Sequence, residues 1–138
     1  MSKYLSDVIR EKMKKDGHRF YACDNVSNYV SDQDKPELIK ELADKFQSVL
    51  DTLLIDTDND PNSKDTAKRL AKMYVYELMA GRFEPKPDTT SFPNEGENRF
   101  EGMLVARAEL RSMCSHHHQP VKGVCYIGII PTARVIGL

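Results

Sequence analysis

Five consecutive residues, Cys114 to His118, bring one thiol and three imidazoles together in a chain with three cysteines and four histidines. Cysteine thiolate and neutral imidazole are ligands that zinc prefers. Cys114 and His117 are three positions apart, so a helical turn points both side chains toward one centre, whereas an extended strand separates them. The spacing predicts a metal-binding turn. The alternative, from these residues alone, is a histidine-rich surface turn with adventitious metal affinity.

The neighbouring histidine offers a second kind of chemistry. A catalytic zinc site uses three protein ligands and leaves one position for water, whereas a structural site closes with four. With two ligands in the turn, a third must come from elsewhere. His116 is then a candidate proton donor or acceptor, because histidine exchanges protons near neutral pH.

The residues on either side of this motif predict strands that position it. An extended run begins at Arg99 and reaches the Cys-His turn, and residues 123–131 are β-branched, apolar and bounded by glycine and proline. We expect the two runs to pair as antiparallel strands with the metal motif between them. Residues 135–138 begin a further apolar segment. Strands without a helix behind them expose an edge and an apolar face, so either partner chains cover them or the sequence is a fragment.

Two amphipathic helices are predicted in the first part of the chain. The first covers Lys3 to Lys15 and ends near Gly17, and residues 18–33 form an arm or loop. The second begins at Asp34, an acidic residue placed to cap it, with Pro36 in its first turn. Its apolar residues recur at helical intervals, which predicts one stripe that is core or subunit contact.

A third helix is predicted over residues 65–81, with Gly81 at its expected end. Arg69 and Lys72 place positive charge near its start, and from spacing alone this is a solvated basic face. Its predicted buried side consists of Leu70, Met73, Tyr74 and Leu78. The proline-rich segment 84–98 is predicted to be a linker.

Composition restricts the class of protein. The 138 residues fit one domain, and fractions of 40% hydrophobic and 30% charged residues are typical of a folded soluble chain. No apolar run approaches the ~20 residues of a membrane-spanning helix. The amino terminus lacks the apolar centre of a signal peptide, and scattered cysteines suit a reducing compartment. A net charge of -1 gives no electrostatic case for nucleic acid. We therefore expect a cytoplasmic protein with no membrane and no nucleic acid as partners.

Several separated motifs together resemble GTP cyclohydrolase I, in the order and spacing of that family from about Glu37 to the last residue. The motifs are Asp65 to Tyr74, Glu77-Leu78 with Gly81, Ser112 to His117, Tyr126 to Pro131 and Val135 to Leu138. The resemblance implies an α+β tunnelling fold, or T-fold, in which N-terminal helices precede an antiparallel β-sheet, here truncated. It also implies a homo-oligomer, commonly a decamer, with active sites between subunits.

This resemblance divides the chain into two parts. Residues 1–33 are an N-terminal helix and arm, and residues 34–138 are a GTP cyclohydrolase I-like domain. Within that domain the resemblance distinguishes a helical part, a linker and a partial T-fold sheet, at residues 34–83, 84–98 and 99–138.

An activity follows from the same resemblance. The family uses Zn²⁺ to activate water for attack on C8 of GTP, and the products are formate and dihydroneopterin triphosphate. Cys114 and His117 match two of the family's three zinc ligands. His116 matches the histidine beside the imidazole ring, an acid suited to protonating the ring as it opens.

The resemblance also concerns substrate binding. Arg69 and Lys72 match basic residues associated with the triphosphate, which makes the basic face of the third helix functional, and Leu138 falls at a substrate-binding position. Two positions depart from the family. Ser115 replaces a usual glutamate, and His118 replaces an apolar residue and is expected to lie in solvent or next to the ligands.

The family's third zinc ligand is a cysteine that would lie beyond Leu138. Cys23 and Cys125 are poor substitutes, and Cys125 is expected to be a buried inert thiol. We therefore expect a zinc-dependent GTP cyclohydrolase I. A site with two of three ligands does not by itself predict activity of the 138-residue chain alone. The alternatives are a non-catalytic zinc- or nucleotide-binding T-fold subunit completed by another chain, and a related T-fold enzyme of deazapurine or pterin metabolism.

Overall fold

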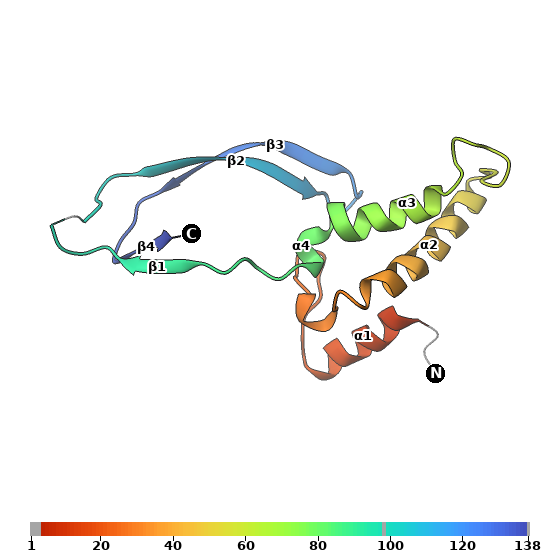
Figure 1. Cartoon of the computed structure of the whole chain (residues 1–138), viewed down its shortest axis with the longest axis horizontal. Helices are drawn as coiled ribbons and strands as arrows, with labels where there is room; N and C mark the ends of the chain where they lie inside the picture. Colours follow the sequence, from red (N-terminus) through yellow and green to blue (C-terminus); the bar gives the residue numbers. More distant parts are fainter. Residues whose placement is uncertain (1–3, 98, 138) are drawn as a thin grey trace. The chain divides into compact units, whose positions relative to one another are not determined.

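The computed structural model describes residues 4–97 and 99–137, and the chain divides between Pro85 and Lys86 into two compact units. The first unit is helical and the second is built from strands (Figure 1). No helix in the described part has both the length and the apolar character needed to span a bilayer.

The helical unit contains six short or medium elements in the described residues. They are the α-helices α1 (Leu5–Lys15), α2 (Lys35–Thr52), α3 (Thr66–Met73) and α4 (Ala80–Phe83), the 3-10 helix η1 (Ser27–Tyr29) and the π-helix η2 (Tyr74–Leu78). Helices α2 and α3 lie side by side (Figure 1).

Helix α1 ends where the sequence predicts. Gly17 follows it with φ 65, a left-handed conformation that glycine adopts without strain. Met13 of α1 is buried against Val26 and Val30. The segment 18–33, predicted as an arm or loop, therefore contributes two buried valines to the core of the helical unit.

Small side chains bring α2 and α3 together. Ala67, Ala71 and Val75 recur every four residues and are buried, and Ala71 and Val75 pack with Ile39 of α2. The predicted buried residues Leu70, Met73, Tyr74 and Leu78 are only half-buried. The buried stripe is thus displaced around the helix, because the small residues permit close approach of the two backbones.

The third helix does not end at Gly81, so that prediction was wrong. Its α-helical hydrogen bonding changes to π-helical in η2, where the Met79 N–H donates to the Tyr74 carbonyl at 3.0 Å. Gly81 then lies inside α4 and is not among the residues with positive φ. This continuation carries Phe83 to both hydrophobic clusters of the helical unit.

Asp34 precedes α2 but does not cap it with its side chain, contrary to the prediction. Its carboxylate instead accepts hydrogen bonds from the Ser31 hydroxyl at 2.6 Å and the Ser31 N–H at 2.8 Å. These bonds lower the pKa of Asp34. The start of α2 is held by the buried Lys35, whose ammonium group pairs with Asp32 and Glu84.

In the second unit, β2 (Leu104–Met113) and β3 (Pro120–Ile129) form a long antiparallel hairpin (Figure 1). Leu104 pairs with Ile129 at one end, and Met113 pairs with Pro120 beside the Cys-His turn. The predicted strand pair with the motif between the strands is confirmed.

A second strand pair includes part of the predicted linker. Strand β1 (Thr90–Pro93) pairs antiparallel with β4 (Arg134–Gly137). Asn94 is buried beside them, and its side-chain amide donates to the carbonyls of Phe100 and Thr132. A polar side chain therefore organises the end of this strand pair.

Candidate metal centre

The loop between β2 and β3, residues 114–119, has the turn that the Cys-x-x-His spacing requires. The Cys114 N–H donates to the Gln119 carbonyl at 2.9 Å, and the His118 N–H donates to the Cys114 carbonyl at 2.9 Å. The second bond joins residues four apart and closes a single helical turn. It places Cys114 and His117 on one side of the loop.

The donor atoms of these two residues fit a zinc ion. Cys114 Sγ lies 3.9 Å from His117 Nδ1. In a tetrahedral zinc site, with sulfur at about 2.3 Å and nitrogen at about 2.0 Å from the metal, the two donors are about 3.5 Å apart. Small side-chain adjustments would bring both donors to a shared metal.

The adjacent histidine is placed almost equally well. His116 Nδ1 lies 4.0 Å from Cys114 Sγ, and the rings of His116 and His117 are 6.3 Å apart. Both histidines are exposed, whereas Cys114 is half-buried. The distances alone therefore do not separate the predicted ligand, His117, from the predicted proton-transfer residue, His116.

His118 has a backbone feature that the sequence does not predict. Its φ is 53, in the left-handed region that non-glycine residues rarely adopt. This conformation reverses the chain after the helical turn and lets Gln119 return to the β3 side of the hairpin. The sequence carries no signal for this left-handed conformation, because asparagine or glycine ordinarily marks such a position.

The described residues do not supply a complete metal site. No group of three or more histidine, cysteine, aspartate or glutamate side chains among them is arranged to hold a metal ion. Cys125 lies in β3, half-buried, and its thiol donates to the Ala108 carbonyl at 3.6 Å. Cys23 is exposed in the helical unit. Within the described residues, Cys114 and a histidine of the loop are thus spaced to share a metal ion, and no third donor is arranged with them.

The predicted phosphate-binding residues lie on the exposed side of α3. Arg69 and Lys72 are exposed, one helical turn apart, on the side away from the buried Ala71. Neither forms an ion pair with another residue in the described part of the chain. Leu138, the third predicted substrate-binding residue, lies outside the described residues.

Comparison with known proteins identifies relatives of this chain. The family model for GTP cyclohydrolase I matches residues 42–138, which include α3 and the Cys-His loop. A GTP cyclohydrolase 1 from Aeromonas salmonicida is 31% identical over 118 residues, covering 82% of this chain and 50% of that protein. One from Flavobacterium johnsoniae is 34% identical over 111 residues, covering 79% of this chain and 47% of that protein.

A third relative, GTP cyclohydrolase 1 from Streptococcus suis, is 39% identical over 83 residues, covering 57% of this chain and 43% of that protein. The chain spans about half the length of the curated relatives it matches. Helices followed by antiparallel strands are also compatible with the fold of this family. The chain belongs to the GTP cyclohydrolase I family.

Proposed function

We propose that the complete protein is a GTP cyclohydrolase I, which opens the imidazole ring of GTP by hydrolysis to give dihydroneopterin triphosphate and formate. Family membership over residues 42–138 supports the activity class. The observation that carries the proposal is the 3.9 Å approach of Cys114 Sγ to His117 Nδ1 within that matched region. A thiolate and an imidazole at this distance are suited to holding the Zn²⁺ that such a hydrolysis needs.

The residues of the loop would divide the work between metal binding and proton transfer. Cys114 and His117 would hold the zinc ion, with a third ligand from outside the described residues. When bound, zinc would lower the pKa of a water molecule and so supply a hydroxide nucleophile for C8 at neutral pH. His116 is exposed to incoming substrate and would donate a proton to the ring nitrogen that leaves C8.

Arg69 and Lys72 are proposed to bind the triphosphate. Both are exposed cations without an acidic partner in the described part of the chain, so their charge is available to an anion. Arginine can form paired hydrogen bonds with a phosphate, and lysine adds a compact positive charge. Leu138 as a substrate contact stays a prediction.

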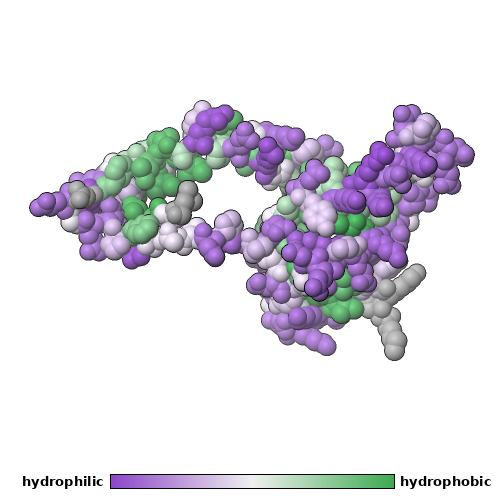
Figure 2. Space-filling model, in the orientation of Figure 1, coloured by the Kyte–Doolittle hydropathy of each residue, from purple (hydrophilic) through white to green (hydrophobic). Residues whose placement is uncertain are grey.

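We also propose a T-fold that assembles as a homo-oligomer, such as a decamer, in the cytoplasm. Consecutive residues of a strand face opposite sides of the sheet. The neighbours Leu104 and Val105 are 46% and 68% exposed, and the neighbours Tyr126 and Ile127 are 72% and 46% exposed. Both faces of the β2–β3 hairpin therefore expose apolar side chains. Hydrophobic residues are also visible over the strands in Figure 2. Further strands or subunits would cover these surfaces.

A non-catalytic T-fold subunit that binds zinc or nucleotide is a second candidate. The observation that favours it is that no group of three metal-ligating side chains among the described residues is arranged to hold an ion. Such a subunit would bind zinc or nucleotide and depend on another chain for turnover.

The test is a zinc-dependent assay for formate and a pterin product, combined with measurement of bound zinc. We expect Cys114→Ala and His117→Ala to remove zinc and activity together in the complete protein, whereas His116→Ala keeps zinc and loses turnover. Cys23→Ala is the matched control, because it removes a thiol from the helical unit. Zinc binding without turnover in the complete protein would favour the non-catalytic subunit, and activity in Cys114→Ala would refute the ligand assignment.

A further inference from the structure

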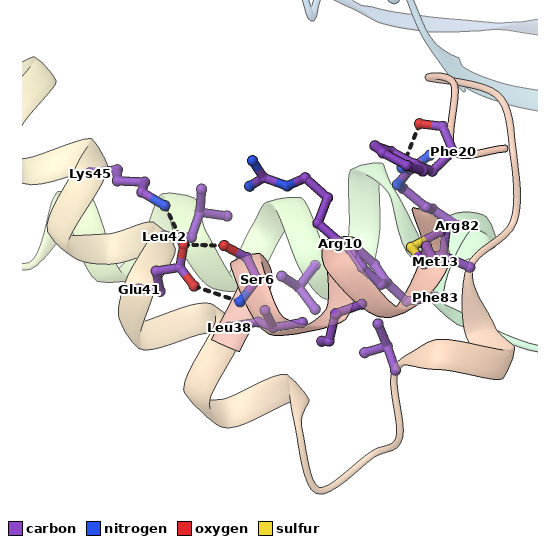
Figure 3. A pocket seen from close by; sticks show the side chains of 14 residues that line it. Ser6, Arg10, Met13, Phe20, Leu38, Glu41, Leu42, Lys45, Arg82 and Phe83 are labelled. Atoms are coloured by element: carbon purple, nitrogen blue, oxygen red, sulfur yellow. Dashed lines mark hydrogen bonds and ion pairs between the residues drawn. The ribbon is translucent and has the colours of Figure 1, made fainter. Parts of the chain in front are cut away.

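The helical unit contains a cavity that the proposed hydrolysis does not use. It lies between α1, α2 and the η2–α4 region and has a volume of about 290 Å³ (Figure 3). Its walls are mainly apolar and include Ile9, Met13, Phe20, Leu38, Leu42 and Phe83. An apolar cavity of about 150 Å³ can hold benzene, so this cavity has room for a larger apolar group.

One end of the cavity carries a carboxylate whose charge is already matched. Glu41 is buried and accepts hydrogen bonds from the Ser6 N–H at 3.2 Å and the Ser6 hydroxyl at 2.6 Å. The Lys45 ammonium group also donates to this carboxylate, as the dashed lines in Figure 3 show. Glu41 and Lys45 therefore neutralise each other.

The other polar residues of the cavity are cationic. The Arg82 guanidinium donates to the carbonyls of Tyr21 at 2.7 Å and Asp24 at 2.9 Å. The nearby Asp24 carboxylate pairs with Arg19 at 2.6 Å, and among the described residues it forms no salt bridge with Arg82. Burial lowers the pKa of Arg82, which reflects a cation removed from water. Arg10 extends from α1, half-exposed, with only a long 3.6 Å contact to Asp7.

These charges leave the lining with an excess of positive charge. The lining contains three cations, Arg10, Lys45 and Arg82, and one carboxylate, Glu41. The carboxylates of Asp7 and Asp24, which lie near Arg10 and Arg82, are outside the lining. An anion would be attracted to this excess, whereas a cation would be repelled, and a neutral ligand would leave it unchanged. The positive charge therefore favours a ligand with an anionic head group, and the apolar walls favour a ligand with an apolar body.

We propose that this cavity binds an amphipathic organic anion, with its apolar body between α1 and α2 and its carboxylate beside Arg10 and Arg82. The apolar body would replace water against the cavity wall, and the carboxylate would accept charge-assisted hydrogen bonds. Most lining residues precede residue 42, where the family match begins. The site thus depends largely on the part of the chain that lies outside the matched region.

Octanoate, octanol and octylamine are matched probes, because they share an apolar chain and differ in the charge of the head group. We would titrate each into the full 138-residue chain labelled with ¹³C at the methionine methyl groups. Met13 lines the cavity, and Met103 and Met113 lie in the strand unit as internal controls. The Met13 signal would be assigned with Met13→Leu.

Octanoate is expected to shift the Met13 signal saturably, at one site per chain, and to bind about fivefold or more tightly than octanol. Octylamine should bind most weakly. Equal affinity for octanoate and octanol would overturn the anion assignment. Shifts at Met103 or Met113 without a shift at Met13 would overturn the location.

Two pairs of variants on α1 test separately the contribution of the Arg10 charge and the contribution of the cavity volume. Arg10→Gln should weaken octanoate binding about fivefold, with Lys15→Gln as the exposed charge control outside the cavity. Ile9→Trp should fill the cavity and abolish binding, with the exposed Val8→Trp as control. Far-UV circular dichroism would check folding of each variant. Unchanged octanoate affinity in folded Arg10→Gln contradicts the proposal, even if Ile9→Trp does not fold.

Discussion

The helical unit buries part of its hydrophobic residues in a core, whereas the described residues of the strand unit bury none. All eight buried apolar residues of the described chain lie before Pro85, on α1, α2, α3, η2 and the segment between α1 and α2. After Pro85, the buried residue is a polar one, Asn94. In Figure 2, hydrophilic residues cover most of the visible helical surface, and hydrophobic residues gather over the strands.

This difference bears directly on the candidate metal centre. The Cys-His loop is carried by the hairpin of β2 and β3, whose large apolar residues are exposed. The same loop has two of the three donors that a catalytic zinc site needs. The candidate metal centre thus lies in the unit that buries none of its apolar residues in the described part of the chain.

The largest expected effect compares a buried valine with an exposed one. Val75 is 3% exposed, and Val105 is 68% exposed. Val75→Asp should lower the free energy of unfolding of the helical unit by about 4 kcal/mol, because it buries a charge without a partner. Urea denaturation followed by far-UV circular dichroism would measure this change.

The matched variant Val105→Asp should change the free energy of unfolding of the helical unit by less than about 0.5 kcal/mol. It should instead reduce self-association in sedimentation experiments, because it places a charge on an apolar sheet surface. Equal losses of helical stability in both variants would contradict the division into a self-sufficient unit and a dependent one.

A smaller effect concerns the contact between α1 and α2. Burial alone would raise the pKa of Glu41, but the hydrogen bonds from Lys45 and Ser6 outweigh it and hold the pKa below its ordinary value of 4.5. Glu41→Gln should cost about 2 kcal/mol at neutral pH, because it weakens charge-assisted hydrogen bonds to a buried group. The exposed Glu37→Gln on the same helix is the control.

The pH dependence of this contribution has a defined sign. Since the pKa of Glu41 is lower in the folded chain, the stabilisation is complete above the unfolded pKa and is lost as pH falls through the folded pKa. The difference in unfolding free energy between wild type and Glu41→Gln should therefore shrink below about pH 4.5. A difference that stays constant down to pH 3 would contradict this assignment.

The smallest expected effect lies in the Cys-His loop. His118→Gly should stabilise the hairpin by about 1 kcal/mol, because glycine adopts the left-handed φ of 53 without a Cβ contact. Ser115→Gly, in the same loop, is the control and should be slightly destabilising. Amide exchange across β2 and β3 would measure both changes, and a destabilising His118→Gly would show that its side chain outweighs backbone strain.

Strong periodic patterns predicted most of the regular structure. The apolar residues of the first two helices and of the two long strands identified those elements, and Gly17 marked the end of α1 correctly. Gly81 was misleading, because the shift to π-helical bonding in η2 lets the chain continue. Strand β1 was missed, because its four residues lie in a proline-rich segment and acquire a partner only when β4 folds beside them.

The candidate site was predictable in part for a similar reason. Local spacing was enough to predict the turn that brings Cys114 toward His117, and the turn is present. Which histidine binds the metal was not decided by spacing, since His116 and His117 approach the same sulfur at 4.0 and 3.9 Å. A third ligand distant in sequence leaves no local pattern, so its identity could not be read from the loop.

X-ray absorption at the zinc K-edge, with zinc below one equivalent per chain, tests the metal assignment most directly. In the 138-residue chain, we predict one sulfur at about 2.3 Å together with imidazole nitrogen at about 2.0 Å. The sulfur signal should vanish in Cys114→Ala and remain in Cys125→Ala and Cys23→Ala, and His117→Ala should lose nitrogen ligation that His116→Ala retains. Zinc–sulfur scattering that persists in Cys114→Ala would contradict the assignment of the Cys-His loop as the metal centre.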